Sequence, residues 1–154
     1  MKWTTLKRLL LLFWAVWLSL VVVFNLADAL KAVGVLPASF VWASGNYSAI
    51  AEVLEPFGLP EAAAGVLLAG VIVWEAVCAG LYWSSGLTYS GIRQERARRL
   101  VVLTFAASLG LWAGFQIACE VFPSELAYRL GGTHRLLFTE TLATLLAVVL
   151  LPDE

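Results

Sequence analysis

Residues 62–83 read AAAGVLLAGVIVWEAVCAGLYW, an apolar run that contains one charged residue, Glu75. A helix of this length crosses a hydrocarbon core of about 30 Å, because each residue adds about 1.5 Å along the helix axis. Three further apolar stretches of similar length occupy residues 6–30, 100–122 and 135–151. The sequence therefore predicts four transmembrane helices in a single integral membrane domain, residues 1–154.

The composition supports this prediction. Hydrophobic residues make up 61% of the chain and charged residues only 14%, whereas a soluble domain carries about 25% charged residues. Pro60, Pro123 and Pro152 lie at expected helix ends, and no proline lies within a predicted span. We expect an all-α fold, a four-helix bundle in the lipid bilayer.

The basic residues predict the orientation, because loops on the cytoplasmic side of a membrane are enriched in Lys and Arg. With a cytoplasmic N-terminus, the cytoplasmic side receives Lys2, Lys7, Arg8, Arg93, Arg96, Arg98 and Arg99. The outer side receives only Lys31, Arg129 and Arg135. We expect a multi-pass protein of the inner (plasma) membrane with both termini in the cytoplasm.

The longest segment between spans, residues 31–60, has an amphipathic pattern. Apolar residues recur at helical spacing at Ile50, Val53, Leu54 and Phe57, and Glu52 and Glu55 fall on the other face. This pattern predicts a short surface helix between the first two spans. Phe40, Val41 and Trp42 add an apolar patch before it. The segment is expected to be either a lid on the bundle or a docking surface for another subunit.

The polar residues within or beside the spans form a candidate intramembrane cluster. Its members are Asn25, Asp28, Glu75, Gln116, Glu120, His134 and Glu140. Matching residue depths along the helices places them in the outer third of the membrane, with His134 at the boundary and Glu75 deeper. A charge at the bilayer centre costs about 2.5–3.5 kcal/mol. We therefore expect Glu75 to be protonated and to donate a hydrogen bond, with Ser108 on the next span at a suitable depth.

Several functions are compatible with this cluster. A path for protons or cations through Glu75, Glu120 and Glu140 is one, since intramembrane carboxylates serve such transport. A purely structural role, which we favour, is hydrogen bonding between helices. A dimetal site is disfavoured because the Glu-x-x-His pairs of such bundles are absent.

Other motifs offer little chemistry. The chain has no Gly-rich phosphate loop and no CxxC, HExxH or GxSxG motif. We expect no catalytic residues, no metal or other cofactor, no enzymatic activity and no nucleic-acid partner. Cys78 and Cys119 lie at different depths and are expected to be free, buried thiols. Gly110 and Gly114 form a GxxxG motif, which we expect to serve packing within the bundle.

A set of short motifs resembles a known family. These are Phe24-Asn25 with Asp28, Trp74-Glu75, and Gly114-Phe115 with Glu120 and Phe122. Their order along the chain is similar to that in a family of small four-helix bacterial integral membrane proteins known as a domain of unknown function. The fourth span departs from the family, which has a Gln-Glu pair before a Phe where this chain has His134-Arg135 before Phe138. The resemblance implies a fold and a membrane location, but no activity.

The function expected from the sequence is that of a small non-catalytic membrane subunit. A well-patterned bundle without catalytic motifs suits an accessory or assembly component of a larger bacterial membrane complex, such as a bioenergetic one. Proton or cation transport is the alternative.

Overall fold

The chain forms an all-helical bundle in the computed structural model, which describes residues 2–92 and 94–153. No strand occurs within these ranges. The helices are α1 (Trp3–Ala32), α2 (Asn46–Leu54), α3 (Glu61–Thr88), α4 (Glu95–Val121) and α5 (Glu125–Leu150), and a short 3₁₀ turn, η1 (Glu55–Phe57), follows α2.

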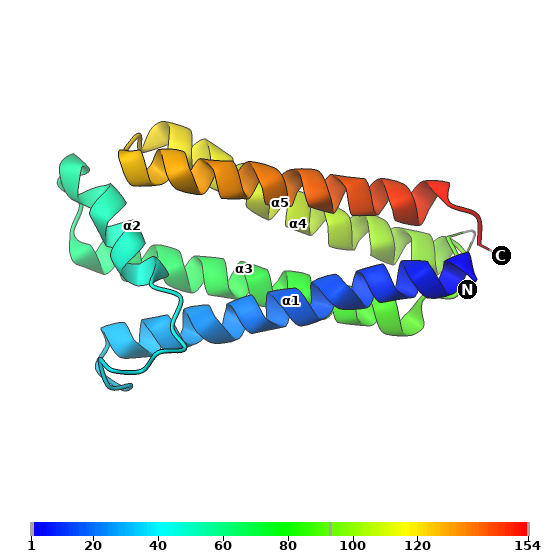
Figure 1. The fold of residues 1–154 in the computed structure, drawn as a ribbon, viewed down its shortest axis with the longest axis horizontal. Coiled ribbons are helices and arrows are strands. Elements are labelled where there is room, and N and C mark those ends of the chain that lie inside the picture. The colour runs from blue at the N-terminus through cyan, green and yellow to red at the C-terminus, as the bar shows by residue number, and fades with distance from the viewer. Residues whose placement is uncertain (1, 93, 154) are drawn as a thin grey trace.

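The long helices run antiparallel to their chain neighbours and form two pairs (Figure 1). Helix α1 packs along α3, α4 packs along α5, and contacts between α3 and α4 join the pairs. Both termini lie at one end of the bundle, which we call the terminal end. Helix α2 lies across the opposite end, which we call the α2 end.

Helices α1, α3, α4 and α5 are each long and apolar enough to cross a membrane. Their inward faces meet in an aromatic core, where Trp14 lies 5.5 Å from Trp17 and 6.2 Å from Tyr82 between ring centroids. Tyr82 in turn meets Phe105 edge-on at 5.4 Å. Their outward faces also carry many large apolar side chains. Helices that are apolar on all sides are typical of membrane spans.

The fourth long helix begins earlier than the sequence predicted. Helix α5 starts at Glu125 rather than near residue 135, and the Ser124 hydroxyl caps it by accepting a hydrogen bond from the Ala127 N–H at 3.0 Å. This is the usual way in which a serine satisfies an otherwise unpaired amide of a first helical turn. His134 consequently lies within α5 rather than before its first residue.

A network of polar contacts closes the terminal end. The Lys7 side chain is fully buried, and its Nζ donates to the Asp153 carboxylate at 2.7 Å and to the Leu151 carbonyl at 2.6 Å. The same carboxylate accepts from the Tyr89 hydroxyl at 3.1 Å and the Ile92 N–H at 2.9 Å. Partial burial and the Asp153 charge raise the pKa of Tyr89, which keeps the phenol a donor. The C-terminal segment is thereby fastened to α1 and to the α3–α4 loop.

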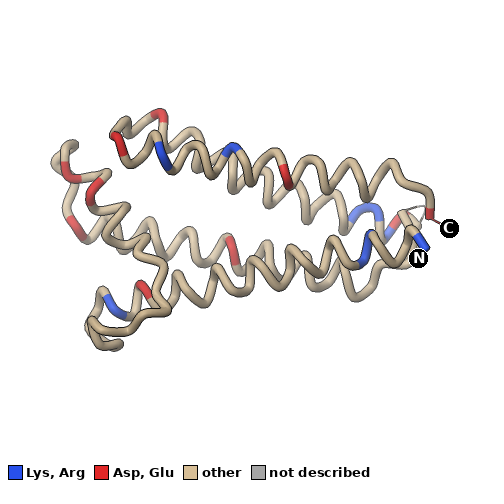
Figure 2. Tube along the Cα trace, viewed as in Figure 1, with Lys and Arg blue, Asp and Glu red and all other residues tan. Residues whose placement is uncertain are grey.

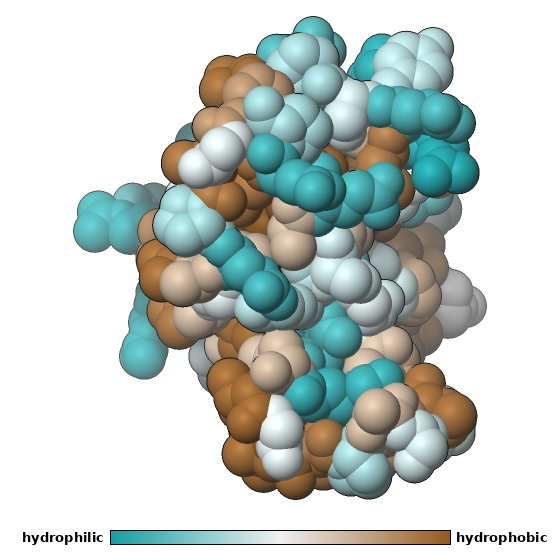
Figure 3. Space-filling model, turned by 90° about the vertical axis from the view of Figure 1, so that its left-hand side faces the viewer, coloured by the Kyte–Doolittle hydropathy of each residue, from teal (hydrophilic) through white to brown (hydrophobic). Residues whose placement is uncertain are grey.

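Charges are distributed unequally between the two ends (Figure 2). Lys and Arg gather toward the terminal end, whereas Asp and Glu are more frequent toward the α2 end. Figure 3 looks onto the α2 end and shows hydrophilic side chains across its centre and hydrophobic ones along its flanks.

The predicted surface helix is present as α2, and it is fastened to the bundle. Leu54 is buried, and Phe57 of η1 meets Phe122 at the end of α4 edge-on at 5.1 Å. Before α2, the Trp42 ring stacks on Phe24 of α1 at 6.1 Å. These contacts give the segment the form of a lid, although Val41 (82%) and Trp42 (64%) remain exposed.

Candidate functional site

Glu75 lies in the bundle interior, where it joins a hydrogen-bonded chain of side chains from three helices. Its Oε2 accepts from Asn25 Nδ2 of α1 at 2.7 Å, and Asn25 Oδ1 accepts from Asn46 Nδ2 of α2 at 2.7 Å. Glu75 is only 3% exposed and Asn25 only 1%. These hydrogen bonds connect Glu75, in the middle of α3, with Asn46 in the first turn of α2.

This arrangement corrects two expectations. The depth count set Glu75 apart from the outer polar residues, but its side chain is in direct contact with that of Asn25. Its hydrogen-bond partner is also Asn25 rather than Ser108, whose hydroxyl has no partner among the described residues. An amide that donates to a buried carboxyl oxygen offsets part of the cost of removing that oxygen from water.

Asp28, one turn after Asn25 on α1, caps the N-terminus of α2 although it lies far from α2 in the sequence. Residue Gly45 precedes α2 with a φ of +79°, a left-handed conformation that glycine adopts readily, and it has no side chain with which to cap the helix. The Asp28 carboxylate does so instead, accepting from the Tyr47 N–H at 2.6 Å and the Ser44 hydroxyl at 3.3 Å. A carboxylate also complements the positive end of the helix dipole. Asn25 and Asp28 together fix the start of α2 against α1.

A line of polar residues continues from Glu75 along the inward face of α3 to the terminal end. We call it the polar file, and it consists of Glu75, Cys78, Tyr82, Ser85 and Tyr89, all of them buried. The alternating spacing of three and four residues keeps the first four of these side chains on one face of α3, and Tyr89 directly follows the last residue of that helix.

Helix α4 presents two hydroxyls to the polar file. The hydroxyls of Ser85 and Thr104 share a hydrogen bond of 2.8 Å. Ser108 neighbours both Cys78 and Tyr82, yet the hydroxyls of Tyr82 and Ser108 lack a hydrogen bond of ordinary geometry in the described part of the chain. Sequence reasoning missed the polar file, although its spacing in residues 75–89 was a usable signal.

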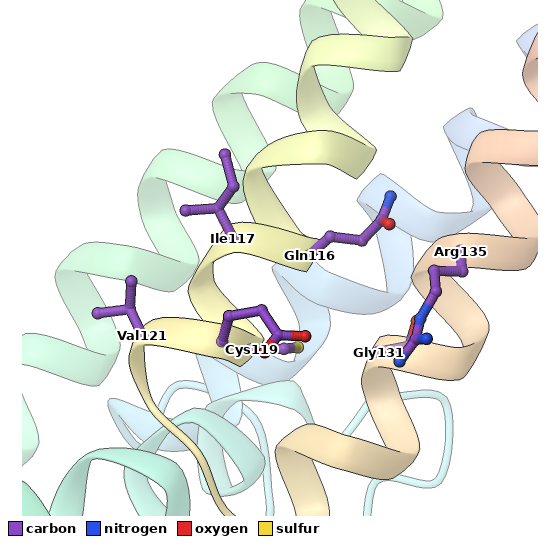
Figure 4. A pocket seen from close by; sticks show the side chains of 7 residues that line it. Gln116, Ile117, Cys119, Val121, Gly131 and Arg135 are labelled. Atoms are coloured by element: carbon purple, nitrogen blue, oxygen red, sulfur yellow. The ribbon is translucent and has the colours of Figure 1, made fainter.

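The remaining predicted residues do not join Glu75. Gln116 and Glu120 line a pocket between α4 and α5 near the α2 end (Figure 4). His134 lies beside it, stacked on Phe115 with ring centroids 4.6 Å apart and with Nδ1 3.8 Å from Cys119 Sγ. The seven residues therefore divide into separate groups.

Glu140 stands apart from both groups. Its side chain is exposed on α5, as the Glu120 side chain is on α4. The route through Glu75, Glu120 and Glu140 that the sequence suggested is therefore not assembled within the bundle.

The two cysteines remain unbonded to each other. Both cysteines are free thiols, but only Cys78 is buried, whereas Cys119 is half-buried. In residues 2–92 and 94–153, no three His, Cys, Asp or Glu side chains lie close enough to hold a metal ion.

An open groove of about 300 Å³ runs between α3 and α4 on the outside of the bundle. It is lined by Val66, Leu67, Gly70, Val71, Trp74, Gly110, Leu111, Gly114 and Phe115. A Cβ atom added at Gly70 or Gly114 would meet no atom within 4 Å, while one at Gly110 would meet only the Trp74 ring at 3.6 Å. Within the GxxxG motif, Gly110 therefore packs beside Trp74 of α3, as expected, whereas Gly114 leaves an open surface, contrary to the expectation of packing within the bundle.

Comparisons of the chain with protein-family models, with curated proteins and with solved structures return no match, so the family resemblance stays a prediction from short motifs.

Proposed function

We propose that this chain is a multi-pass protein of the inner membrane, with both termini in the cytoplasm, and serves as a non-catalytic accessory or assembly subunit of a larger bacterial membrane complex. Four long apolar helices support insertion into the bilayer. The gathering of Lys and Arg at the terminal end supports the orientation.

The groove between α3 and α4 is the observation that carries the subunit proposal. Its lining combines three glycines, Gly70, Gly110 and Gly114, with exposed apolar side chains that include Val66 and Trp74. Helices in membranes associate through such small residues, because they let two backbones approach closely. A lipid chain gains nothing from glycines in the lining, whereas a helix backbone does, so the groove fits a transmembrane helix of a partner subunit better than it fits lipid.

Filling the groove tests this proposal. Leucine at Gly114 would extend into this open space, since nothing lies within 4 Å of the added Cβ. Gly80→Leu is the matched control, because Gly80 is also an exposed glycine of a long helix with no atom near an added Cβ, but it does not line the groove.

The measurement is native gel electrophoresis of membranes from the natural host, solubilised in mild detergent. We expect the wild type and Gly80→Leu to migrate in a complex much larger than the 16.7 kDa chain, and Gly114→Leu to migrate alone. A wild-type protein that migrates at its own monomer or homodimer mass would exclude the accessory-subunit function.

Proton binding and transfer is a second candidate function, and the polar file is the observation that favours it. A carboxyl or hydroxyl group both donates and accepts hydrogen bonds, so a proton can be transferred from one group to the next along a row of them. The polar file offers these groups from Glu75 to Tyr89. The amides of Asn25 and Asn46 donate through nitrogen and accept through oxygen, so neither passes a proton on through a single atom, and the exchange would connect Glu75 with the terminal end.

Proton uptake into proteoliposomes under an imposed potential tests this candidate. We expect Glu75→Gln and Tyr82→Phe to abolish uptake, because each removes one member of the polar file. Glu140→Gln serves as the control, since it neutralises an exposed carboxylate outside the polar file. Absence of uptake by the wild type would remove transport from consideration.

A further inference from the structure

A pocket lies between the last turns of α4 and the early turns of α5, at the α2 end (Figure 4). Its volume is about 470 Å³. It is lined by Gln116, Ile117, Cys119, Glu120, Val121, Gly131 and Arg135. Its lining combines an anion, a cation and apolar side chains, whereas the α3–α4 groove is wholly apolar.

The two charged residues of the pocket come from different helices. Glu120 and Arg135 are both exposed, and neither forms an ion pair with a described residue. Arg135 Nε donates to the Gly131 carbonyl at 3.3 Å, one turn earlier on α5, so the guanidinium extends toward the α2 end. Long basic side chains of membrane helices extend in this way toward the headgroup region.

The pocket also continues into an apolar surface. Two of the residues that line the pocket, Ile117 (64% exposed) and Val121 (58% exposed) of α4, are also part of the exposed apolar surface of that helix. A molecule that binds there can therefore place polar groups between Glu120 and Arg135 and hydrocarbon against α4. Unpaired charges on a membrane helix are costly, and a ligand of complementary charge relieves that cost.

We propose that this pocket binds the headgroup of a zwitterionic aminophospholipid, phosphatidylethanolamine. An arginine fork matches phosphate oxygens in geometry and charge, which assigns the phosphate to Arg135. The primary ammonium is a donor that the Glu120 carboxylate can accept, and the acyl chains follow Ile117 and Val121. An anionic headgroup would leave Glu120 unmatched, and a choline headgroup has no N–H to donate.

This inference rests on membrane insertion, as proposed above, but not on a partner subunit. It is therefore tested on the purified chain in detergent, where loss of a partner complex has no effect on the result. Native mass spectrometry measures binding of phosphatidylethanolamine, phosphatidylcholine and phosphatidylglycerol with the same acyl chains.

We expect phosphatidylethanolamine to bind about tenfold more tightly than the other two lipids, which corresponds to one charge-assisted hydrogen bond of about 1.4 kcal/mol. Arg135→Gln and Glu120→Gln should each weaken that binding by a similar factor. Arg129→Gln and Glu125→Gln are matched controls, because they make the same charge changes on exposed residues of α5 that do not line the pocket.

Equal affinity for the three lipids, or an equal loss in the control variants, would overturn the proposal. Free phosphoethanolamine separates a lipid from a soluble ligand of the same chemistry. We expect it to compete poorly, since it lacks the acyl chains, and competition at the concentration of the lipid would overturn the assignment to a lipid.

Discussion

Replacing the buried pair of Glu75 and Asn25, singly and together, tests whether their contact organises the bundle. Glu75→Leu leaves the Asn25 Nδ2 without its acceptor, and Asn25→Leu leaves the Glu75 carboxyl without its donor. The double variant removes both polar groups and replaces them with apolar side chains of similar size. Asn46 also loses its acceptor in Asn25→Leu, but it is half-buried and can turn toward water.

The expected magnitudes follow from the burial of the pair. An unpaired buried donor or acceptor costs about 1–3 kcal/mol, whereas hydrogen bonds between membrane helices average about 0.6 kcal/mol with a maximum of about 1.7. Since Glu75 and Asn25 are 3% and 1% exposed, we expect each single replacement to cost about 1.5 kcal/mol of unfolding free energy. The double replacement should cost about 1 kcal/mol, which gives a coupling energy of about 2 kcal/mol.

Reversible unfolding in mixed micelles of detergent and dodecyl sulfate measures these free energies. Glu75→Gln is the control, because it keeps an oxygen acceptor for Asn25 and should change stability by less than about 0.5 kcal/mol. Additive costs of the two single replacements would refute the reasoning, since partners in one buried contact must couple. A large loss in Glu75→Gln would show that the contact requires a carboxyl group rather than a neutral acceptor.

Two further predictions concern the buried ion pair of Lys7 with Asp153 and the close contact of Gly86 with Leu12, and the same unfolding assay measures both. Asp153→Ala should lower the unfolding free energy by about 3 kcal/mol, because it leaves Lys7 buried without its counter-ion. The control Glu95→Ala removes only an exposed ion pair and should lower it by less than about 0.5 kcal/mol. Equal losses of stability in the two variants would contradict the buried pairing. Gly86→Ala should cost about 1–3 kcal/mol, because its Cβ would lie 2.7 Å from Leu12 Cδ2 and 3.3 Å from the Leu12 nitrogen. Gly80→Ala, with nothing within 4 Å, should instead leave stability unchanged or raise it by up to about 1 kcal/mol, and a similar loss in both variants would argue against close packing at Gly86.

The sequence predicted the helices well wherever the apolar pattern was continuous. The four long helices and the short helix between the first two follow directly from runs of apolar residues and from the spacing of residues 50–57. The start of α5 was missed because residues 125–134 include charged and polar side chains that interrupt the apolar run. The capping residue Ser124 was a signal for that start, and it is local in the sequence.

The partners of the polar residues were harder to predict, for a physical reason. Counting about 1.5 Å per residue from each helix end assumes parallel axes and equal starting depths. Asn25 and Glu75 violate the depths assigned in this way. Asn46 could not be recognised as their neighbour, because the path of residues 33–45 back along α1 depends on tertiary contacts such as the Ser44 N–H to the Phe24 carbonyl at 3.2 Å.

The two candidate functions use different faces of α3, and this makes them separable. The groove face carries Gly70 and Trp74, whereas the polar file begins at Glu75 and points into the bundle. The Trp74 indole closes the boundary between them, since its Nε1 donates to the Ala107 carbonyl of α4 at 3.1 Å. A helix in the groove therefore has no direct access to Glu75. Gly114→Leu should abolish assembly without changing proton uptake. Glu75→Gln should abolish proton uptake without changing assembly. Loss of both properties in either variant would mean that the two faces act as one site.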